Sequence, residues 1–287
     1  MATKLTYSVL LIFLFNCSAS FEEVKKITHS QTKSFNEYLF AEYKEKAIFE
    51  AEKMHDWNSA KLYSEKALLA NKGWKVFPQK LEYWKLQKNS KNEIKIAYDN
   101  LIAIYEDSLE KDPYNLAKAV SSLDCWSEQQ EEKWQSWDIK KCKEDFLNSM
   151  HILYSKITKN VDNIDNNKTL VFKKNKNKKI TQIIYFDFDE AILSDVSIKT
   201  IKKYIEKNKY QIKNYTILGY TDTKGTKEYN LKLSLRRANA VRKIFIKYGI
   251  ENSQIRILGK GEDFLAINTD DEVKHPANRR AEIITSN

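Results

Sequence analysis

The stretch Gly219–Val241, GYTDTKGTKEYNLKLSLRRANAV, joins a predicted strand to a predicted helix. The β-rich residues Tyr215–Tyr220 predict the strand, and the apolar periodicity of Lys227–Tyr248 predicts a long helix. Gly219 and Gly225 open and close the turn between them, because glycine adopts the backbone conformations that tight turns require. The stretch therefore predicts a strand–turn–helix unit.

Two opposite charges stand in this unit, Asp222 in the turn and Arg237 on the helix. Arg237 lies on the edge of the apolar stripe, one turn after Leu233, whereas Arg236 points toward solvent. Burying an unpaired charge costs several kcal/mol, so an anionic group is expected to meet Arg237. Its planar guanidinium group can donate two parallel hydrogen bonds to a carboxylate. Spacing alone leaves two interpretations open: a salt bridge between Asp222 and Arg237 that pins the turn, or a pair that binds a zwitterionic ligand.

The pattern around this unit predicts an α+β domain. Further strands and an amphipathic helix complete the order strand–helix–strand–helix–strand–strand, which predicts a small sheet covered by two helices. The additional elements are Ile183–Phe188, Ser197–Lys207, Ile255–Leu258 and Ala281–Thr285.

Four separated motifs over residues 181–287 resemble the OmpA C-terminal family. Phe186–Asp189 resembles the family's first strand, and Gly219–Val241 its Thr-Asp-x-x-Gly signature. Lys260–Glu262 resembles its Gly-Glu turn, and Asn278–Glu282 its closing Asn-Arg-Arg-x-Glu. The resemblance, which is strongest to peptidoglycan-associated lipoproteins, implies an OmpA-like β-α-β-α-β-β sandwich that binds peptidoglycan.

The resemblance also implies a binding site. In the family, the residues that match Asp222 and Arg237 bind the two ends of diaminopimelate, a residue of the peptidoglycan stem peptide. Thr221 is expected to cap the Asp222 turn. We expect Asp222→Ala and Arg237→Ala each to abolish binding without unfolding the domain. The supporting groove is expected to comprise Phe186, Asp187, Thr221, Asn230, Leu233, Ser234 and Arg279.

The first twenty residues, MATKLTYSVLLIFLFNCSAS, have the pattern of a secretory signal. Leu14–Cys17 resembles a lipobox, in which Cys17 would become a lipidated N-terminus; the alternative is cleavage after Ser20, which discards Cys17. Ser18 after the cysteine favours the outer membrane. We therefore expect the protein at the periplasmic face of the cell outer membrane.

Residues 21–157 predict a helical domain, because apolar residues recur at helical spacing. Asp56–Ala70 resembles one unit of a tetratricopeptide-type repeat, without a clean second copy. Cys125 and Cys142 form an even pair in an oxidising compartment, which favours a disulfide over two buried thiols. The Lys- and Asn-rich residues 158–180 predict a basic linker.

The segment Leu123–Phe146 resembles the helical N-terminal region of OmpA-family proteins from alphaproteobacteria. Its aromatic and Gln-rich character leaves two interpretations. Either it forms a surface for a partner protein, or Trp126, Trp134 and Trp137 pack the core of the helical domain.

Composition argues against several functions. The net charge of +10 comes without a zinc-finger or RNA-recognition signature, so nucleic acid is not an expected partner. The four histidines are scattered, which predicts neither a metal site nor a cofactor. A wall hydrolase would need a metal, a Cys/His pair or paired carboxylates, and Asp187 and Asp189 are expected on opposite faces of a strand.

We therefore predict a non-enzymatic protein that tethers the outer membrane to the cell wall. The alternative is an envelope scaffold, whose helical domain binds another envelope protein while the wall domain anchors it passively. A flagellar stator-like protein would need a membrane-spanning helix near the N-terminus, which residues 1–20 do not supply.

Overall fold

The computed structural model describes residues 19–28, 34–133, 136–158, 179–208 and 214–286. Cys17 and most of the predicted linker at 158–180 lie outside these ranges. The chain divides into two compact units: residues 1–101 with 108–149, and residues 102–107 with 150–287. This boundary falls inside a helix, eight residues before the one that the sequence predicts at 157. None of the described helices is both long and apolar enough to cross a lipid bilayer.

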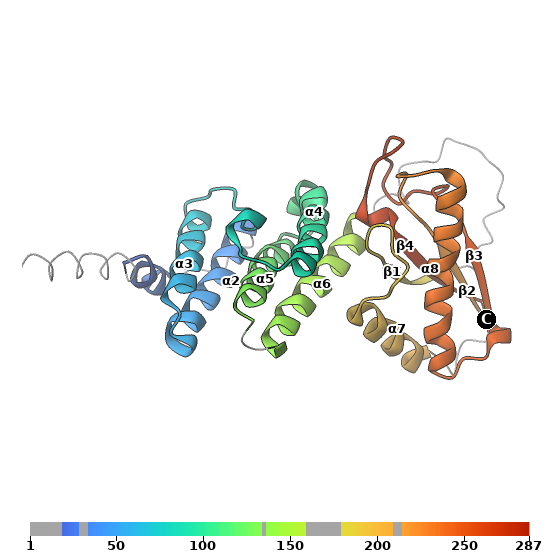
Figure 1. Ribbon diagram of the computed structural model, residues 1–287, viewed down its shortest axis with the longest axis horizontal. Coiled ribbons are helices and arrows are strands. Elements are labelled where there is room, and N and C mark those ends of the chain that lie inside the picture. The colour runs from blue at the N-terminus through green and yellow to red at the C-terminus, as the bar shows by residue number, and fades with distance from the viewer. Residues whose placement is uncertain (1–18, 29–33, 134–135, 159–178, 209–213, 287) are drawn as a thin grey trace, which may run out of the picture. The chain divides into compact units, whose positions relative to one another are not determined.

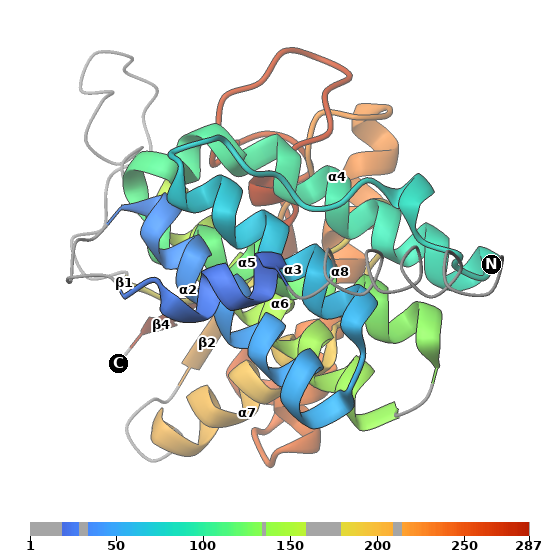
Figure 2. The ribbon, with the colours of Figure 1, turned by 90° about the vertical axis from the view of Figure 1, so that its left-hand side faces the viewer.

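The first unit is helical, and its helices begin where the sequence places capping residues. Ser34 caps the helix that begins at Phe35, in a reciprocal capping box with Glu37, and Asp56 and Asp112 cap two others. α2 packs against both α3 and α5 (Figures 1 and 2). The elements are α2 (Phe35–Phe49), the π-helical turn η1 (Glu50–Met54), α3 (Trp57–Asn71), η2 (Leu81–Tyr83), α4 (Lys88–Lys111), α5 (Pro113–Glu132) and α6 (Ser136–Thr158).

A disulfide and aromatic packing connect α5 with α6. Cys125 and Cys142 are bonded, with their Cα atoms 5.7 Å apart, so the expected disulfide is present. Trp126 is buried against Phe146, with ring centroids 6.0 Å apart. Trp137, in contrast, is 59% exposed. Core packing was therefore the right interpretation for Trp126 and the wrong one for Trp137, and Trp134 lies outside the described residues.

The second unit contains a four-stranded mixed sheet with the strand order β1-β4-β2-β3. β2 runs parallel to β3, and β4 runs antiparallel to both β1 and β2. The predicted β-α-β-α-β-β order is confirmed. The elements are β1 (Lys179–Tyr185), α7 (Asp195–Asn208), β2 (Asn214–Gly219), α8 (Lys227–Lys247), η4 (Asn252–Gln254), β3 (Ile255–Gly259), η5 (Pro276–Asn278) and β4 (Arg280–Ser286).

The two helices of this unit cover the sheet and enclose its apolar core. α7 contacts β1, α8 contacts β2 and β3, and the two helices contact each other (Figure 1). Val241 and Phe245 of α8 pack on Ile217 of β2 and Ile283 of β4 within one cluster of buried side chains. The apolar stripe of α8 therefore faces the sheet, as its periodicity predicts.

Two glycines bring α8 unusually close to the sheet. Gly219 and Gly259 are paired in register at the ends of the parallel strands β2 and β3. A Cβ atom on Gly219 would lie 1.8 Å from the backbone oxygen of Ser234, and one on Gly259 would lie 2.7 Å from the Ser234 hydroxyl. The middle of α8 thus rests against bare backbone, which fixes the helix, and Arg237 one turn further on, at this end of the sheet.

Candidate ligand-binding site

Arg237 is completely buried and ties the loop after β1 to the end of β2. Its Nε donates to the carbonyl oxygen of Glu190 at 2.8 Å, and its Nη1 to that of Tyr220 at 2.9 Å. Its Nη2 donates to the carbonyl oxygen of Asp187 at 3.0 Å. Three of the five N–H groups of a guanidinium are therefore engaged within the described part of the chain.

The Arg237 guanidinium keeps its charge in this buried position. Burial and, to a lesser degree, the nearby Arg279 lower its pKa to about 9, while Asp222 opposes the change. A pKa of about 9 still leaves the group charged at neutral pH. The guanidinium also lies over the Phe186 ring, 5.4 Å from its centroid. The sequence led us to expect an anionic group at Arg237; in the free protein it is met instead by backbone carbonyl oxygens and an aromatic face.

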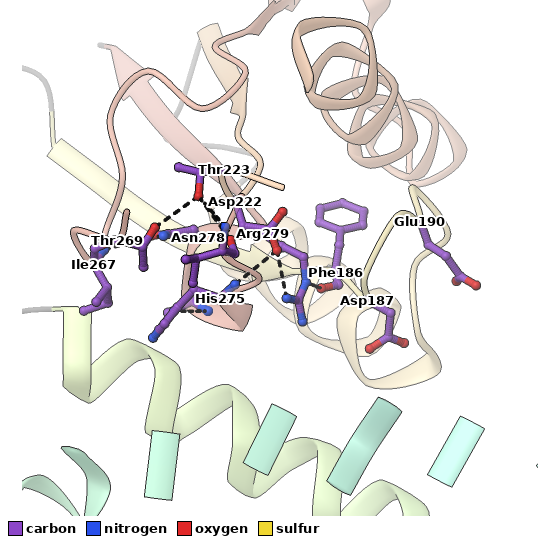
Figure 3. Close-up of polar contacts among 12 residues, drawn as sticks. Phe186, Asp187, Glu190, Asp222, Thr223, Ile267, Thr269, His275, Asn278 and Arg279 are labelled. Carbon is purple, nitrogen blue, oxygen red and sulfur yellow. Dashed lines mark hydrogen bonds and ion pairs between the residues drawn. The ribbon is translucent and has the colours of Figure 1, made fainter. Parts of the chain in front are cut away.

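Asp222 is also buried, but its ion pair is with Arg279. Arg279 Nη1 lies 3.1 Å from Asp222 Oδ2, and the backbone N–H of His275 donates to the same oxygen at 3.2 Å (Figure 3). Oδ1 has no hydrogen bond among the described residues. The alternative interpretation, in which Asp222 forms a salt bridge with Arg237, is therefore wrong. The Asp222 carboxylate pairs instead with Arg279, from the loop before β4.

Phe186 and Arg279 join the two charged residues into one framework. The Phe186 backbone N–H donates to the Arg279 carbonyl oxygen at 2.9 Å, and Arg279 Nε donates back to the Phe186 carbonyl oxygen at 3.3 Å. Figure 3 shows Phe186, Arg279 and Asp222 together at this end of the sheet. Arg279 thus holds Asp222 directly, and the Phe186 ring supports Arg237. The two charges lie at the same end of the unit.

Residues 185–279 match the OmpA family. The chain carries an OmpA family domain at its C-terminus. Outer membrane porin F of Pseudomonas aeruginosa is 41% identical over 81 residues, which are 28% of this chain and 23% of the porin. The peptidoglycan-associated lipoprotein of Legionella pneumophila is 33% identical over 104 residues, 36% of this chain and 59% of the lipoprotein. The matches therefore span less than two thirds of these relatives.

A solved structure is also similar to the OmpA domain. The crystal structure of the peptidoglycan-associated lipoprotein from Burkholderia pseudomallei has 30% sequence identity, covers 37% of this chain and 91% of that chain, and gives a TM-score of 0.34.

Two predicted groove residues of the OmpA domain act as internal supports. Asn230 Nδ2 donates to Glu262 Oε2 at 2.6 Å, and the Ser234 hydroxyl accepts from the Gly261 backbone N–H at 2.9 Å. Both side chains are buried, as is Leu233 on the same helix face. Through these bonds α8 holds the Gly-Glu turn that follows β3.

The turn that carries Asp222 is stabilised by Thr223. The Thr223 hydroxyl donates to the Asp270 carbonyl oxygen at 2.6 Å and accepts from the Val273 backbone N–H at 3.1 Å. The buried Thr221 hydroxyl has no hydrogen-bond partner among the described residues. The capping role expected of Thr221 is therefore wrong, because its hydroxyl is buried without a partner among the described residues, while that of Thr223 meets the loop before β4.

The segment Phe186–Asp189 is a loop rather than the strand that the sequence predicts. β1 ends at Tyr185, and Asp189 has a positive φ of 59°. Two of the three carbonyl partners of Arg237, those of Asp187 and Glu190, come from the backbone that has left the sheet here. The expectation that Asp187 and Asp189 face opposite sides of a strand is wrong twice, because residues two apart on a strand share a face and because this segment is not a strand. Asp189 instead accepts a hydrogen bond from the Tyr229 hydroxyl.

His275 is a site residue that the sequence did not indicate. Besides binding Asp222 through its backbone, it accepts the Ala277 backbone N–H on its ring Nδ1 at 3.3 Å. Burial lowers the pKa of its imidazole, so the ring is neutral near pH 7. A loop histidine has no periodic pattern around it, and neither His275 nor Thr223 carried a signal in the sequence.

Proposed function

We propose that this protein is a non-catalytic, peptidoglycan-binding protein of the cell envelope, whose OmpA domain grips diaminopimelate between Asp222 and Arg237. One observation carries the proposal: a carboxylate and a guanidinium are fixed at one end of the domain by the shared Phe186–Arg279 framework. Each charged group also retains hydrogen-bonding capacity that the described residues do not use.

The free end of diaminopimelate carries one ammonium and one carboxylate group. The ammonium matches the unused acceptor oxygen of Asp222, and the carboxylate matches the unused N–H donors of Arg237. Asp222 Oδ1 is available to accept from the ammonium, because both contacts of this side chain go to Oδ2. The two remaining N–H groups of Arg237 suit the ligand carboxylate. In a site of low local dielectric such charge-assisted bonds are stronger than in water. A single charge would attract any counterion, whereas the pair selects a zwitterion.

Ligand entry is expected to involve the loop after β1. Arg237 is covered in the free protein, and two of its three carbonyl partners, Asp187 and Glu190, belong to this loop. The side chains of both residues are exposed. We expect this loop to move aside so that the ligand carboxylate reaches the two remaining N–H groups of Arg237, while Arg279 keeps Asp222 in place.

The relatives support an envelope location. The names of the similar proteins from P. aeruginosa and L. pneumophila place one in the outer membrane and describe the other as a peptidoglycan-associated lipoprotein. We extend this to a tether: Cys17, once lipidated, would hold the protein at the periplasmic face of the outer membrane while the OmpA domain holds the wall. The disulfide between Cys125 and Cys142 fits an oxidising compartment.

Sedimentation with purified sacculi tests the proposal. Wild-type protein is expected to co-sediment, and Asp222→Asn and Arg237→Lys are expected to remain largely in the supernatant. Arg236→Ala is the matched control, because Arg236 is the exposed neighbour of Arg237. Free meso-diaminopimelate should compete, and cadaverine, which carries both ammonium groups but no carboxylate, should not. Undiminished sedimentation of both site variants would exclude this site.

A scaffold is the second candidate, supported by a feature of the helical unit. A hollow of about 840 Å³ opens there between α3 and the segment that follows it, and Trp74 and Tyr83 on its lining are 65% and 53% exposed. Large exposed aromatic side chains are typical of protein contact surfaces. Co-purification from crosslinked envelopes with wild-type protein and with Trp74→Ala tests it: a defined partner lost in the variant would support the scaffold, and an identical set of proteins would exclude this surface.

A further inference from the structure

Three carboxylates from different elements converge in the helical unit, apart from the OmpA domain. Glu50 begins the π-helical turn η1, Asp56 is the N-cap of α3, and Glu128 lies in α5. One oxygen from each lies within 4.8 Å of those of the other two. Glu50 and Glu128 are only 5% and 2% exposed. Such a cluster is unfavourable unless something neutralises it.

Only one of the two Glu128 oxygens is hydrogen-bonded among the described residues, and the Ser59 side chain lies near enough to lower the pKa of this carboxyl. Glu128 Oε2 accepts from the Tyr63 hydroxyl, but Glu128 Oε1 is buried and has no hydrogen-bond partner among the described residues. Asp56 uses Oδ1 to cap α3, accepting from the Asn58 backbone N–H at 2.8 Å, and its side chain also contacts the Glu132 carboxyl. A buried acceptor without a donor costs about 1–3 kcal/mol, and more when it is charged. The unpartnered oxygen therefore points to a cation that completes the cluster.

The charge balance agrees with this interpretation. Burial and mutual repulsion raise the pKa of Glu50 to about 8, and burial raises the pKa of Glu128 to about 7. Glu132, beside Asp56, is raised to about 6, again chiefly by burial. Lys46 is the nearby cation, and burial lowers its pKa. Without a bound cation the cluster thus retains protons near neutral pH, because one lysine does not balance four carboxylates.

We propose that Glu50, Asp56 and Glu128 bind a Ca²⁺ ion, a site independent of the proposed wall-binding function. All three donors are oxygens, which hard cations prefer. Oxygens bound to one Ca²⁺ at about 2.4 Å lie up to about 4.8 Å apart, whereas those around Mg²⁺ at about 2.1 Å lie within about 4.2 Å. The three oxygens, all within 4.8 Å of one another, lie close enough together to bind one Ca²⁺ ion. Calcium also tolerates the irregular geometry that three separate elements impose.

The ion would connect three parts of the helical unit. Glu50 follows directly on α2, Asp56 starts α3 and Glu128 belongs to α5, and α2 is the helix that packs on the other two. Binding only the folded state raises its stability by mass action. Binding also displaces the protons that the carboxylates hold, so it is tighter at higher pH.

Thermal unfolding of the full chain, first stripped with chelator, tests the site at pH 7.5. We expect Ca²⁺ at about 5 mM, enough for a weak extracellular-type site, to raise the Tm of the helical unit by several degrees in the wild type. Glu128→Gln and Glu50→Gln should remove this shift. Glu45→Gln is the control, because Glu45 is an exposed acid on α2 and should keep the full shift. Without Ca²⁺, Glu128→Gln should unfold no earlier than the wild type, since it resembles the protonated form.

Isothermal titration gives a second readout that does not depend on stability. One Ca²⁺ should bind per chain, with protons released, and the two glutamine variants should show no binding. The proposal is overturned if chelator-stripped wild type shows no Ca²⁺ response, if both glutamine variants respond as the wild type does, or if Mg²⁺ gives an equal shift. Sacculus sedimentation should be unchanged in Glu128→Gln, so failure of this site and failure of the wall-binding site are distinguishable.

Discussion

The Asp222 carboxylate forms its ion pair with Arg279, at 3.1 Å, and leaves Arg237 to be satisfied by backbone carbonyl oxygens. The two site residues are therefore held separately, one by a side chain and one by main-chain atoms. Neither has to break a bond to the other when a ligand arrives. This arrangement changes which substitutions test the site cleanly.

Asp222→Asn should separate binding from folding. The amide oxygen still accepts from Arg279 and from the His275 backbone, but the charge that pairs with a ligand ammonium is lost. We expect wall binding to fall at least about tenfold, since a charged hydrogen bond contributes about 1.5–3 kcal/mol. The free energy of unfolding should drop by about 1–3 kcal/mol, because Arg279 stays buried beside a neutral partner. Sedimentation with sacculi and urea unfolding measure the two effects; unchanged wall binding would contradict the assignment.

Arg237→Ala is expected to destabilise the OmpA domain, contrary to the expectation from sequence. Removing the guanidinium leaves the carbonyl oxygens of Asp187, Glu190 and Tyr220 without their donor. Each unsatisfied buried group costs about 1–3 kcal/mol. Urea unfolding should show a loss of several kcal/mol, while Arg236→Ala changes stability by less than about 0.5 kcal/mol. Equal stability of the two variants would mean that the carbonyl contacts contribute nothing.

Gly219→Ala should loosen the contact between α8 and the sheet. The added methyl group meets the Ser234 backbone oxygen, which cannot move without displacing the helix. We expect a loss of about 3 kcal/mol in unfolding free energy and weaker wall binding through the displaced Arg237. Gly73→Ala is the comparison: nothing lies within 4 Å of its Cβ position, so only its positive φ costs about 1 kcal/mol. Urea unfolding that gives the larger loss for Gly73→Ala would contradict the close packing.

Reduction of the disulfide should destabilise the helical unit. Cys125 and Cys142 are 17 residues apart, and a loop of that size contributes about 3 kcal/mol in the chain-entropy model. We expect the urea midpoint of the helical unit to fall under reducing conditions, and the double variant Cys125→Ser, Cys142→Ser to be insensitive to reductant. A wild-type midpoint that does not respond to reductant would show that the bond contributes little.

The helical unit should lose stability as the pH rises. The folded-state pKa values of Glu50 and Glu128, about 8 and about 7, lie above the ordinary value of 4.5. The folded state therefore binds more protons than the unfolded state between these limits, and the free energy of unfolding falls from about pH 5 to pH 8. Thermal melts in chelator should show this decline, and Glu128→Gln should flatten it. A Tm that rises over the same interval would contradict the raised pKa values.

Local patterns predicted the elements but not the contacts between them. The strand at Tyr215–Tyr220 and the helix at Lys227–Tyr248 agree with β2 and α8 to within one residue at each end, because glycines and periodicity mark them. The ion pair of Asp222 with Arg279 joins residues that are 57 apart, and no local signal encodes it. The residues Phe186–Asp189 have the pattern of a strand but form a loop. Its backbone binds the distant Arg237 side chain, and no local pattern in the sequence encodes that contact.

The carboxylate cluster shows the same limit. The scattered histidines and cysteines predict no metal site. Glu50, Asp56 and Glu128 each look like ordinary polar residues of helices in the sequence. Only the packing of α2 on α3 and α5 brings them together.

The glycine pair on β2 and β3 has a consequence for the guanidinium that follows it on α8. Because Gly219 and Gly259 have no side chains, the backbone of β2 and β3 is the nearest neighbour of α8 at this point. The height of Arg237 above the strand ends is then set chiefly by this close backbone contact, so exchanges among the apolar side chains further along the helix are expected to change that height little.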